Sequence, residues 1–235
     1  MKQKNSPVLA LLGMPIGNLN DITFRQYEYL IKADLILCEE YKSASRILKH
    51  LGIQSDGRLE LYNEHNQAEM LEEILSRIKQ NKLTVLISDA GMPAFCDPGG
   101  ALVKLAAHRD IKLEIVPGPT ALGAALALFG QASDGFVFAG FPPRKTEERA
   151  LFFRKFRNSK VPVVFYETPY RTKKFLGEIQ KEMQDTNKKV FVAIDITADK
   201  EYILDVPVRE IGRYESSIPK GPPVVILYES GNIQI

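Results

Sequence analysis

Five short apolar runs, each followed by a polar loop and a helical pattern, fill the first half of the chain. The runs are 8–12, 33–38, 59–62, 83–88 and 111–116. Their alternation with amphipathic segments predicts a parallel sheet with helices packed on its faces. Because every connecting loop leaves the carboxyl end of a strand, the five loops are expected at one edge of that sheet. This edge is the usual ligand site of open α/β sheets.

The pattern changes near residue 119. An alanine- and leucine-rich helix at 120–129 is followed by apolar runs at 136–139, 161–166, 189–194 and 224–228, with helical patterns between them. Residues 195–220 show neither a helical nor a strand period. We predict an α/β protein of two domains, 1–118 with a parallel five-stranded sheet and 119–235 with a mixed sheet.

Charge is unevenly distributed, although the 235 residues carry a net charge of only +2. The span from Arg144 to Lys174 contains ten basic and three acidic residues, a local balance of +7, and the remainder balances at −5. Such a segment indicates an anionic partner, and a solvated helix face explains it equally well. Neither a membrane-spanning run nor a signal peptide is apparent, so a cytoplasmic protein without membrane contact is expected.

Metal chemistry is not predicted. Cys38 and Cys96 are the only cysteines, and neither has a metal-ligand spacing to another cysteine or to a histidine. We expect two buried or half-buried thiols in a reducing compartment, with Cys96 serving in packing. No GxGxxG follows a strand, and GxxxxGK[ST] and GxSxG are absent. These absences argue against a dinucleotide oxidoreductase, a P-loop NTPase and an α/β-hydrolase.

Two polar loops at the predicted edge are candidates for chemistry. Residues 88–100 form a loop rich in glycine, proline and aspartate, with Asp89 and Asp97 as its acids. Glycine lets a ligand approach the backbone and proline fixes φ, so the loop suits a binding site, and it suits a structural turn equally well. In the second loop, His65 stands between Glu64 and Asn66, and it is the histidine most suited to a site.

Glycine- and proline-containing motifs recur in a fixed order along the chain. They are Gly13-Met14-Pro15-Ile16-Gly17-Asn18, Ser88-Asp89-Ala90-Gly91-Met92-Pro93, Val116-Pro117-Gly118-Pro119-Thr120-Ala121 and Gly140-Phe141-Pro142-Pro143-Arg144-Lys145. Together they resemble the tetrapyrrole methylase superfamily over nearly the whole chain. Tyr166-Glu167-Thr168-Pro169-Tyr170-Arg171 and Glu64-His65-Asn66 are similar to motifs of the branch that methylates the 2′ oxygen of a cytidine ribose in 16S ribosomal RNA.

This resemblance implies an S-adenosylmethionine-dependent methyltransferase of two α/β domains, with the cofactor in the cleft between them, acting as a homodimer. It also implies ribosomal RNA or the small ribosomal subunit as partner. The residues that it assigns to the cofactor are Pro15, Asp89, Ala90, Gly91, Met92, Pro93, Asp97, Pro117, Gly118, Thr120, Ala121, Tyr166, Glu167 and Thr168.

Catalysis by such a protein requires mainly positioning, because the methyl group of the cofactor is already activated. A ribose hydroxyl is a poor nucleophile, so a base is expected to help. The candidates are Glu64 or His65 as base and Lys145 as charge stabiliser. Asp89 and Asp97 are expected to order their loop and to place the methyl donor.

Several motifs depart from that branch. An arginine is missing after the second strand, where the chain reads Cys38-Glu39-Glu40-Tyr41-Lys42, and Asn63 replaces a histidine. The later stretches Ile194-Asp195-Ile196-Thr197-Ala198 and Lys220-Gly221-Pro222-Pro223 also differ, and the C-terminal segment of longer relatives is expected to be lacking. Two alternatives therefore stay open. One is a methyltransferase of an anionic, tetrapyrrole-like small molecule, and the other is a non-catalytic protein that binds S-adenosylmethionine or RNA.

Overall fold

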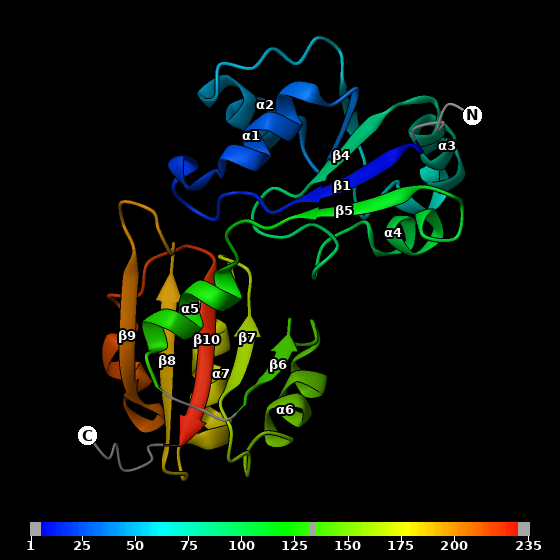
Figure 1. Ribbon diagram of the computed structural model, residues 1–235. Helices are drawn as coiled ribbons and strands as arrows, with labels where there is room; N and C mark the ends of the chain where they lie inside the picture. The colour runs from blue at the N-terminus through cyan, green and yellow to red at the C-terminus, as the bar shows by residue number, and fades with distance from the viewer. Residues whose placement is uncertain (1–5, 132–134, 230–235) are drawn as a thin grey trace. The chain divides into compact units, whose positions relative to one another are not determined.

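The computed structural model describes residues 6–131 and 135–229, and it divides the chain into two compact units, Met1–Thr120 and Ala121–Ile235 (Figure 1). We call them unit 1 and unit 2. Across the described ranges, none of the helices has the length and apolar character needed to span a membrane.

Unit 1 alternates strands and helices. Its elements are β1 (Val8–Leu12), η1 (Leu19–Asp21), α1 (Phe24–Lys32), β2 (Leu35–Cys38), α2 (Tyr41–His50), β3 (Leu59–Leu61), α3 (Gln67–Gln80), β4 (Leu83–Ile87), α4 (Gly100–Ala106) and β5 (Lys112–Val116). The strands form one sheet in the order β3-β2-β4-β1-β5, and every neighbouring pair is parallel. The predicted parallel sheet is confirmed, and the loops after its five strands share one edge.

Alternation along each strand builds two cores, one on each face of this sheet. Ala10 and Leu12 of β1 pack in the core that contains α1 and α2, whereas Leu9 packs in the core that contains α3 and α4 (Figure 1). Successive side chains of a strand point to opposite faces, so strands covered on both faces read as continuous apolar runs. This is why the strands of unit 1 are visible in the sequence.

Unit 2 contains the second sheet. Its elements are α5 (Ala121–Phe129), β6 (Val137–Gly140), α6 (Thr146–Arg154), β7 (Val163–Tyr166), α7 (Thr172–Met183), β8 (Lys188–Ile194), β9 (Tyr202–Pro207), η2 (Val208–Tyr214) and β10 (Pro223–Glu229). The strand order is β6-β7-β10-β8-β9, in which β6 and β7 are parallel and the other pairs are antiparallel. The predicted mixed sheet is confirmed.

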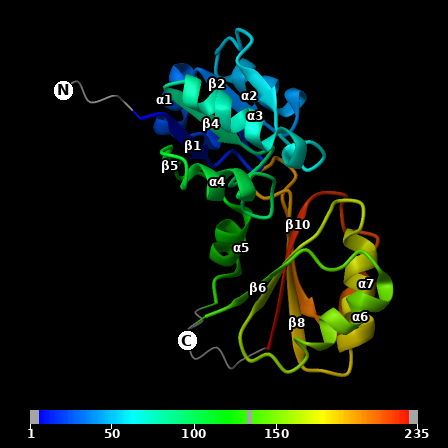
Figure 2. The ribbon, with the colours of Figure 1, turned by 90° about the vertical axis from the view of Figure 1, so that its right-hand side faces the viewer.

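Helices cover both faces of the second sheet. Figure 2 shows α6 and α7 on one side of β8 and β10, and α5 on the other. Phe153, Phe165 and Phe175 pack together beneath α6 and α7. On the other face, the Phe129 ring at the end of α5 lies 4.8 Å from the Tyr228 ring, centroid to centroid. Aromatic packing therefore attaches α5 to the sheet of unit 2.

Candidate functional site

The loops at the carboxyl edge of unit 1 are joined through their backbones. Met14 donates its N–H to the carbonyl of Gly91 at 2.6 Å, and Gly91 donates back to Met14 at 3.0 Å. Gly13 donates to the carbonyl of Val116 at 3.2 Å. The loops that follow β1, β4 and β5 thus form one connected surface, which contains most of the cofactor residues predicted from the sequence.

Two glycines allow these loops to touch. A Cβ on Gly118 would overlap the carbonyl oxygen of Gly13 and the side-chain nitrogen of Gln26. Gln26 is fully buried, donates this nitrogen to the Gly13 carbonyl and accepts from the N–H of Thr23 at 2.5 Å. Only glycine lets the backbones approach this closely. The sequence analysis missed Gln26, whose signal is its position in a capping box, Thr23-x-x-Gln26, at the start of α1.

The loop after β4 is tightly turned. Gly91 and Gly99 have φ of +74° and +116°, and the non-glycine residues Ala94 and Cys96 have φ of +62° and +64°. Such angles cost about 1–2 kcal/mol per non-glycine residue and persist only where surrounding contacts fix them. The hydroxyl of Ser88 lies 3.1 Å from the carbonyl oxygen of Gly91, within the same loop.

Cys96 corrects one expectation. Its side chain is exposed, and Cys38 alone is buried. The tight turn around Cys96 leaves its thiol on the surface of the loop, so it serves no packing role. Burial, helped by the nearby charges of Asp89, Glu60 and Glu39, raises the pKa of the Cys38 thiol to about 12. The Cys38 thiol is therefore protonated and inert at neutral pH.

Three carboxyl groups meet between the loops after β2 and β4. The Asp89 N–H donates to the Glu39 carboxylate at 3.0 Å. Burial raises the pKa of Asp97 to about 7, helped by the charges of Glu39 and Asp89 and opposed by a hydrogen bond from Ser88. Burial also raises the pKa of Glu39 and of Asp89. The edge therefore offers carboxyl acceptors, and their mutual repulsion makes a nearby positive charge favourable.

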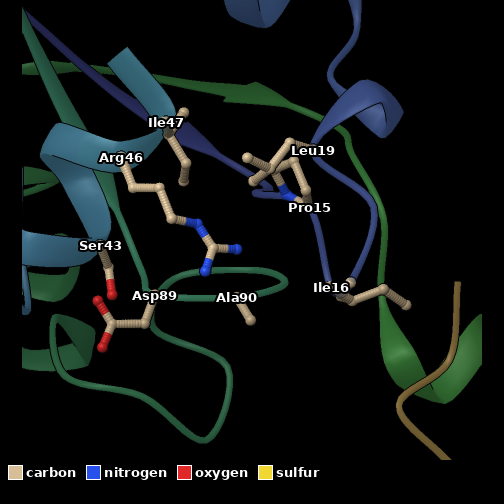
Figure 3. Close-up of a pocket in the computed structure, with 9 residues that line it drawn as sticks. Pro15, Ile16, Leu19, Ser43, Arg46, Ile47, Asp89 and Ala90 are labelled. Atoms are coloured by element: carbon tan, nitrogen blue, oxygen red, sulfur yellow. The ribbon is translucent and has the colours of Figure 1, made fainter. Parts of the chain in front are cut away.

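A cavity of about 170 Å³ opens beside these carboxyl groups (Figure 3). Its lining residues come from the loop after β1, from α2 and from the loop after β4. They are Pro15, Ile16, Gly17, Leu19, Ser43, Arg46, Ile47, Asp89 and Ala90. Figure 3 shows the Arg46 guanidinium reaching from α2 into this space and the Ser43 hydroxyl directed at Asp89. The Ser43 hydroxyl and the Glu40 N–H hydrogen-bond the Asp89 carboxylate.

Arg46 and Ser43 were not predicted from the sequence. Arg46 is exposed and forms no ion pair within the part of the chain that the structure describes. The sequence does carry a signal for it. The resemblance described above leads us to expect an arginine where Lys42 stands. Arg46 lies four residues later, one helical turn further along the same face of α2.

Glu64 and His65 lie together on the loop after β3. Asn63 accepts from the His65 N–H at 3.0 Å, and its own N–H donates to the Asn66 side chain at 2.8 Å. Asn63 also donates to the carbonyl of Glu39 at 3.3 Å. These bonds present Glu64 and His65 to solvent, with 68% and 84% of their side chains exposed and Oε1 and Nε2 3.8 Å apart. Asn63 therefore holds the loop in place.

The predicted residues of unit 2 have partners within that unit. The Tyr166 hydroxyl accepts from the Leu122 N–H at 2.9 Å. Glu167 is buried, accepts from the Thr168 N–H at 2.7 Å and lies 3.1 Å from the Arg171 guanidinium. Lys145 precedes α6 with 81% of its side chain exposed and lies 3.3 Å from Glu148.

Ion pairs neutralise much of the basic segment 144–174. Arg149 is buried against Glu178 at 2.5 Å and donates to the carbonyls of Pro143 and Arg144, so it fixes the loop before α6. The other paired members are Lys145, Arg154, Arg157, Lys160 and Arg171. Within residues 135–229, no ion pair involves Arg144, Lys155, Lys173 or Lys174. The charge available to a partner is therefore smaller than the sequence count.

No group of three or more His, Cys, Asp and Glu side chains suited to a metal ion occurs among the described residues.

Comparison with known proteins gives the same family for nearly the whole chain. The model of the tetrapyrrole (corrin/porphyrin) methylases matches residues 8–212. A ribosomal RNA small subunit methyltransferase I of Leptospira borgpetersenii is 34% identical over 229 residues, which are 97% of this chain and 90% of that protein. The protein of the same name from Thermotoga maritima is 36% identical over 220 residues, 93% of this chain and 97% of its own length.

Solved structures share the fold at low identity. Diphthine synthase superposes with a TM-score of 0.72 at 15% identity, covering 94% of this chain and 89% of that one. The uroporphyrin-III C-methyltransferase of Thermus thermophilus, complexed with S-adenosylhomocysteine, superposes with a TM-score of 0.64 at 19% identity. The match covers 94% of this chain and 97% of that one. The connected glycine loops, the two α/β units and the match over residues 8–212 agree: the chain belongs to the tetrapyrrole methylase family.

Proposed function

We propose that this protein is an S-adenosylmethionine-dependent methyltransferase that methylates the 2′ oxygen of a cytidine ribose in 16S ribosomal RNA. The observation that carries the proposal is the carboxyl edge of unit 1, where connected glycine loops adjoin a cluster of carboxyl groups. The choice of substrate rests on the relatives, whose names specify ribosomal RNA and whose similarity extends over more than nine-tenths of the chain.

The edge fits the chemistry of this cofactor. Because Gly91 and Gly118 carry no side chain, the loops pack closely and nothing from these two positions intrudes on an adenosine that lies against the edge. Asp89 and Asp97 supply acceptors for ribose hydroxyls and an α-ammonium group, and their negative charge favours a sulfonium. Further contacts to the cofactor are proposed from unit 1 at Pro15, Ala90, Met92, Pro93, Pro117 and Thr120. In unit 2 the proposed cofactor residues are Ala121, Tyr166, Glu167 and Thr168.

The protein's own task is to position the acceptor hydroxyl and receive its proton. When bound, the cofactor supplies an activated methyl group. Glu64 or His65 takes the hydroxyl proton as the O–CH₃ bond forms and the S–CH₃ bond breaks. Both groups are solvent-exposed and adjacent, so a proton received by one passes readily to water. Lys145 stabilises negative charge on the nucleic acid or on the reacting oxygen.

Homodimer formation is also proposed, and an apolar surface on unit 1 supports it. Phe24, Tyr27 and Ile31 are exposed along one face of α1, Phe24 by 90%. Exposed apolar side chains along one face of a helix are typical of protein interfaces. We place the protein in the cytoplasm, with the ribosomal subunits it would modify.

The test is methyl transfer to small ribosomal subunits from a strain that lacks the gene, followed by mass spectrometry of the ribosomal RNA. A new 2′-O-methylcytidine is expected with wild-type protein. Glu64→Ala combined with His65→Ala is expected to slow single-turnover transfer about 100-fold or more while cofactor binding is unchanged. Glu69→Ala, an equivalent change at an exposed position of α3, is the matched control.

Two results would contradict parts of the proposal. An unchanged ribose methylation pattern in the presence of wild-type protein would remove ribosomal RNA as the substrate. Unchanged transfer by the double variant would remove Glu64 and His65 as bases. The uroporphyrin-III C-methyltransferase structure is only 19% identical to this chain, so its similarity supports a shared fold and not a shared substrate. No structural observation therefore favours the tetrapyrrole-like alternative.

A further inference from the structure

One edge of the sheet in unit 2 gathers the loops of all five strands. Strands β6, β7 and β8 end at this edge, whereas β9 and β10 begin there (Figure 1). The register pairs Tyr166, the last residue of β7, with Val224 near the start of β10. Tyr170 lies four residues after Tyr166, and Lys220 lies four residues before Val224. The register therefore brings these two side chains together from loops far apart in the sequence.

Tyr170 and Lys220 form an exposed pair that no function described so far uses. Tyr170 is 82% exposed, and the Lys220 ammonium lies 4.0 Å from the centroid of its ring. One face of the ring thus carries a cation, and at this exposure the other face is open to solvent. Across the described residues, Lys220 has no ion pair with a carboxylate, so its charge is available to an anionic ligand.

Both loops are held in place. The buried Thr172 hydroxyl, at the start of α7, lies 3.4 Å from the Gly221 carbonyl oxygen. Asp195 donates its N–H to Pro222 at 3.4 Å, and a Cβ on Gly221 would overlap the Asp195 carboxylate. The loop around Lys220 is therefore packed on both sides, and the exposed pair is preorganised before any ligand arrives.

An open aromatic face beside an unpaired ammonium matches the chemistry of single-stranded nucleic acid. Successive bases stack on aromatic side chains while cations contact the phosphates between them. A double helix keeps its bases stacked on one another, and Tyr170 offers no groove-reading group. Arg144, at the same edge after β6, and Lys173, on the first turn of α7, add exposed positive charge without ion pairs among residues 135–229.

We propose that Tyr170 and Lys220 form a subsite for single-stranded RNA, in which one nucleobase stacks on the open face of Tyr170 and Lys220 contacts an adjacent phosphate. This inference rests on the proposed function, because it assigns part of the RNA substrate to this edge of unit 2. It adds a binding role for residues that take no part in the chemistry.

Fluorescence provides a direct test, because the chain contains no tryptophan. Tyr170→Trp introduces a single indole, and titration with a single-stranded RNA decamer is expected to quench its emission through base stacking. Phe136→Trp is the matched control. Phe136 is a half-exposed aromatic residue just before β6, at the opposite edge of the same sheet, and its indole is expected to show no quenching.

Affinity measurements separate stacking from charge. Tyr170→Ala is expected to weaken binding of the decamer roughly 5- to 100-fold, and Tyr170→Phe to retain it. Lys220→Ala is expected to lower the slope of log affinity against log salt by about 0.7, the value for one phosphate contact on a single strand. Lys155→Ala removes the same charge after the far end of α6 and is expected to leave the slope unchanged.

The outcomes distinguish this subsite from the proposed function. Wild-type binding and methylation of RNA, with no quenching in Tyr170→Trp and unchanged affinity in Tyr170→Ala, would overturn the subsite and leave the proposed function standing. Failure of wild-type protein both to bind RNA and to methylate it would overturn both. Circular dichroism and cofactor binding equal to wild type are expected for every variant, since each changes an exposed or half-exposed side chain.

Discussion

Replacing Asp97 by asparagine is expected to stabilise unit 1 at pH 8 and to have little effect on its stability at pH 4. The carboxyl group of Asp97 lies half-buried in the loop after β4, near the charges of Glu39 and Asp89. These surroundings disfavour its ionised form, and its pKa rises from 3.8 to about 7. Asparagine keeps the shape and the polar character of the side chain and removes the charge.

The sign follows from proton linkage. Between pH 4 and pH 7 the folded protein keeps a proton on Asp97 that the unfolded chain has released, so stability falls as pH rises through this window and is then constant. The full rise in pKa corresponds to about 4 kcal/mol at pH 8. Because water reaches part of the carboxyl group and screens the charges, we expect roughly 1–2 kcal/mol.

Urea unfolding of wild type and Asp97→Asn at pH 4 and pH 8 measures the effect. Hydrogen exchange of the β4 amides assigns it to unit 1, since the strands of a core open last. Asp110→Asn, an exposed position in the same unit, is the control. A stability difference that is the same at both pH values, or an asparagine variant that is less stable at pH 8, would refute the reasoning. The variant is also expected to bind S-adenosylmethionine more weakly, because the proposed site loses a charged acceptor.

Two further substitutions test the packing that positions the loops. Gly118→Ala is expected to destabilise unit 1 by about 1–3 kcal/mol, because its Cβ would overlap Gln26; Gly100→Ala, where a Cβ meets open space, should show no such loss in a thermal melt. Arg149→Met is expected to cost about 3–5 kcal/mol in urea unfolding, because Glu178 would keep a charge without its partner. Equal melting temperatures for the two glycine variants, or a neutral Arg149→Met, would contradict these estimates.

The sequence by itself determined the architecture of unit 1. Its central strands β1, β2 and β4 are covered on both faces, so each appears as a nearly continuous apolar run, and its helices show the 3.6-residue period of a half-buried element. Both signals are local, so the alternation of strands and helices could be predicted from the sequence alone. The order of the strands in the sheet could not. The glycine motifs were visible for the same reason, since close backbone contact restricts residue type at single positions such as Gly118.

Residues 195–220 show where local pattern fails. They contain β9, which pairs with β8 as an edge strand, and the 3-10 helix η2, which packs against α7. An edge strand buries only alternate residues, and a short 3-10 helix has too few turns to establish a period. Their burial depends on contacts with elements that precede them in the chain, and no window of sequence contains both partners.

Tertiary structure alone decided which charged side chains pair with one another and which remain free. The basic segment 144–174 appeared as an anion-binding surface, yet Arg149 pairs with Glu178 and Lys160 with Glu229, 69 residues away. Arg46 enters the cavity beside Asp89 because α2 and the loop after β4 converge at the sheet edge. Charge pairing and exposure are set by through-space distance, which the order of residues does not encode locally. The scaffold was therefore predictable from the sequence, and the charges that remain free for a ligand were not.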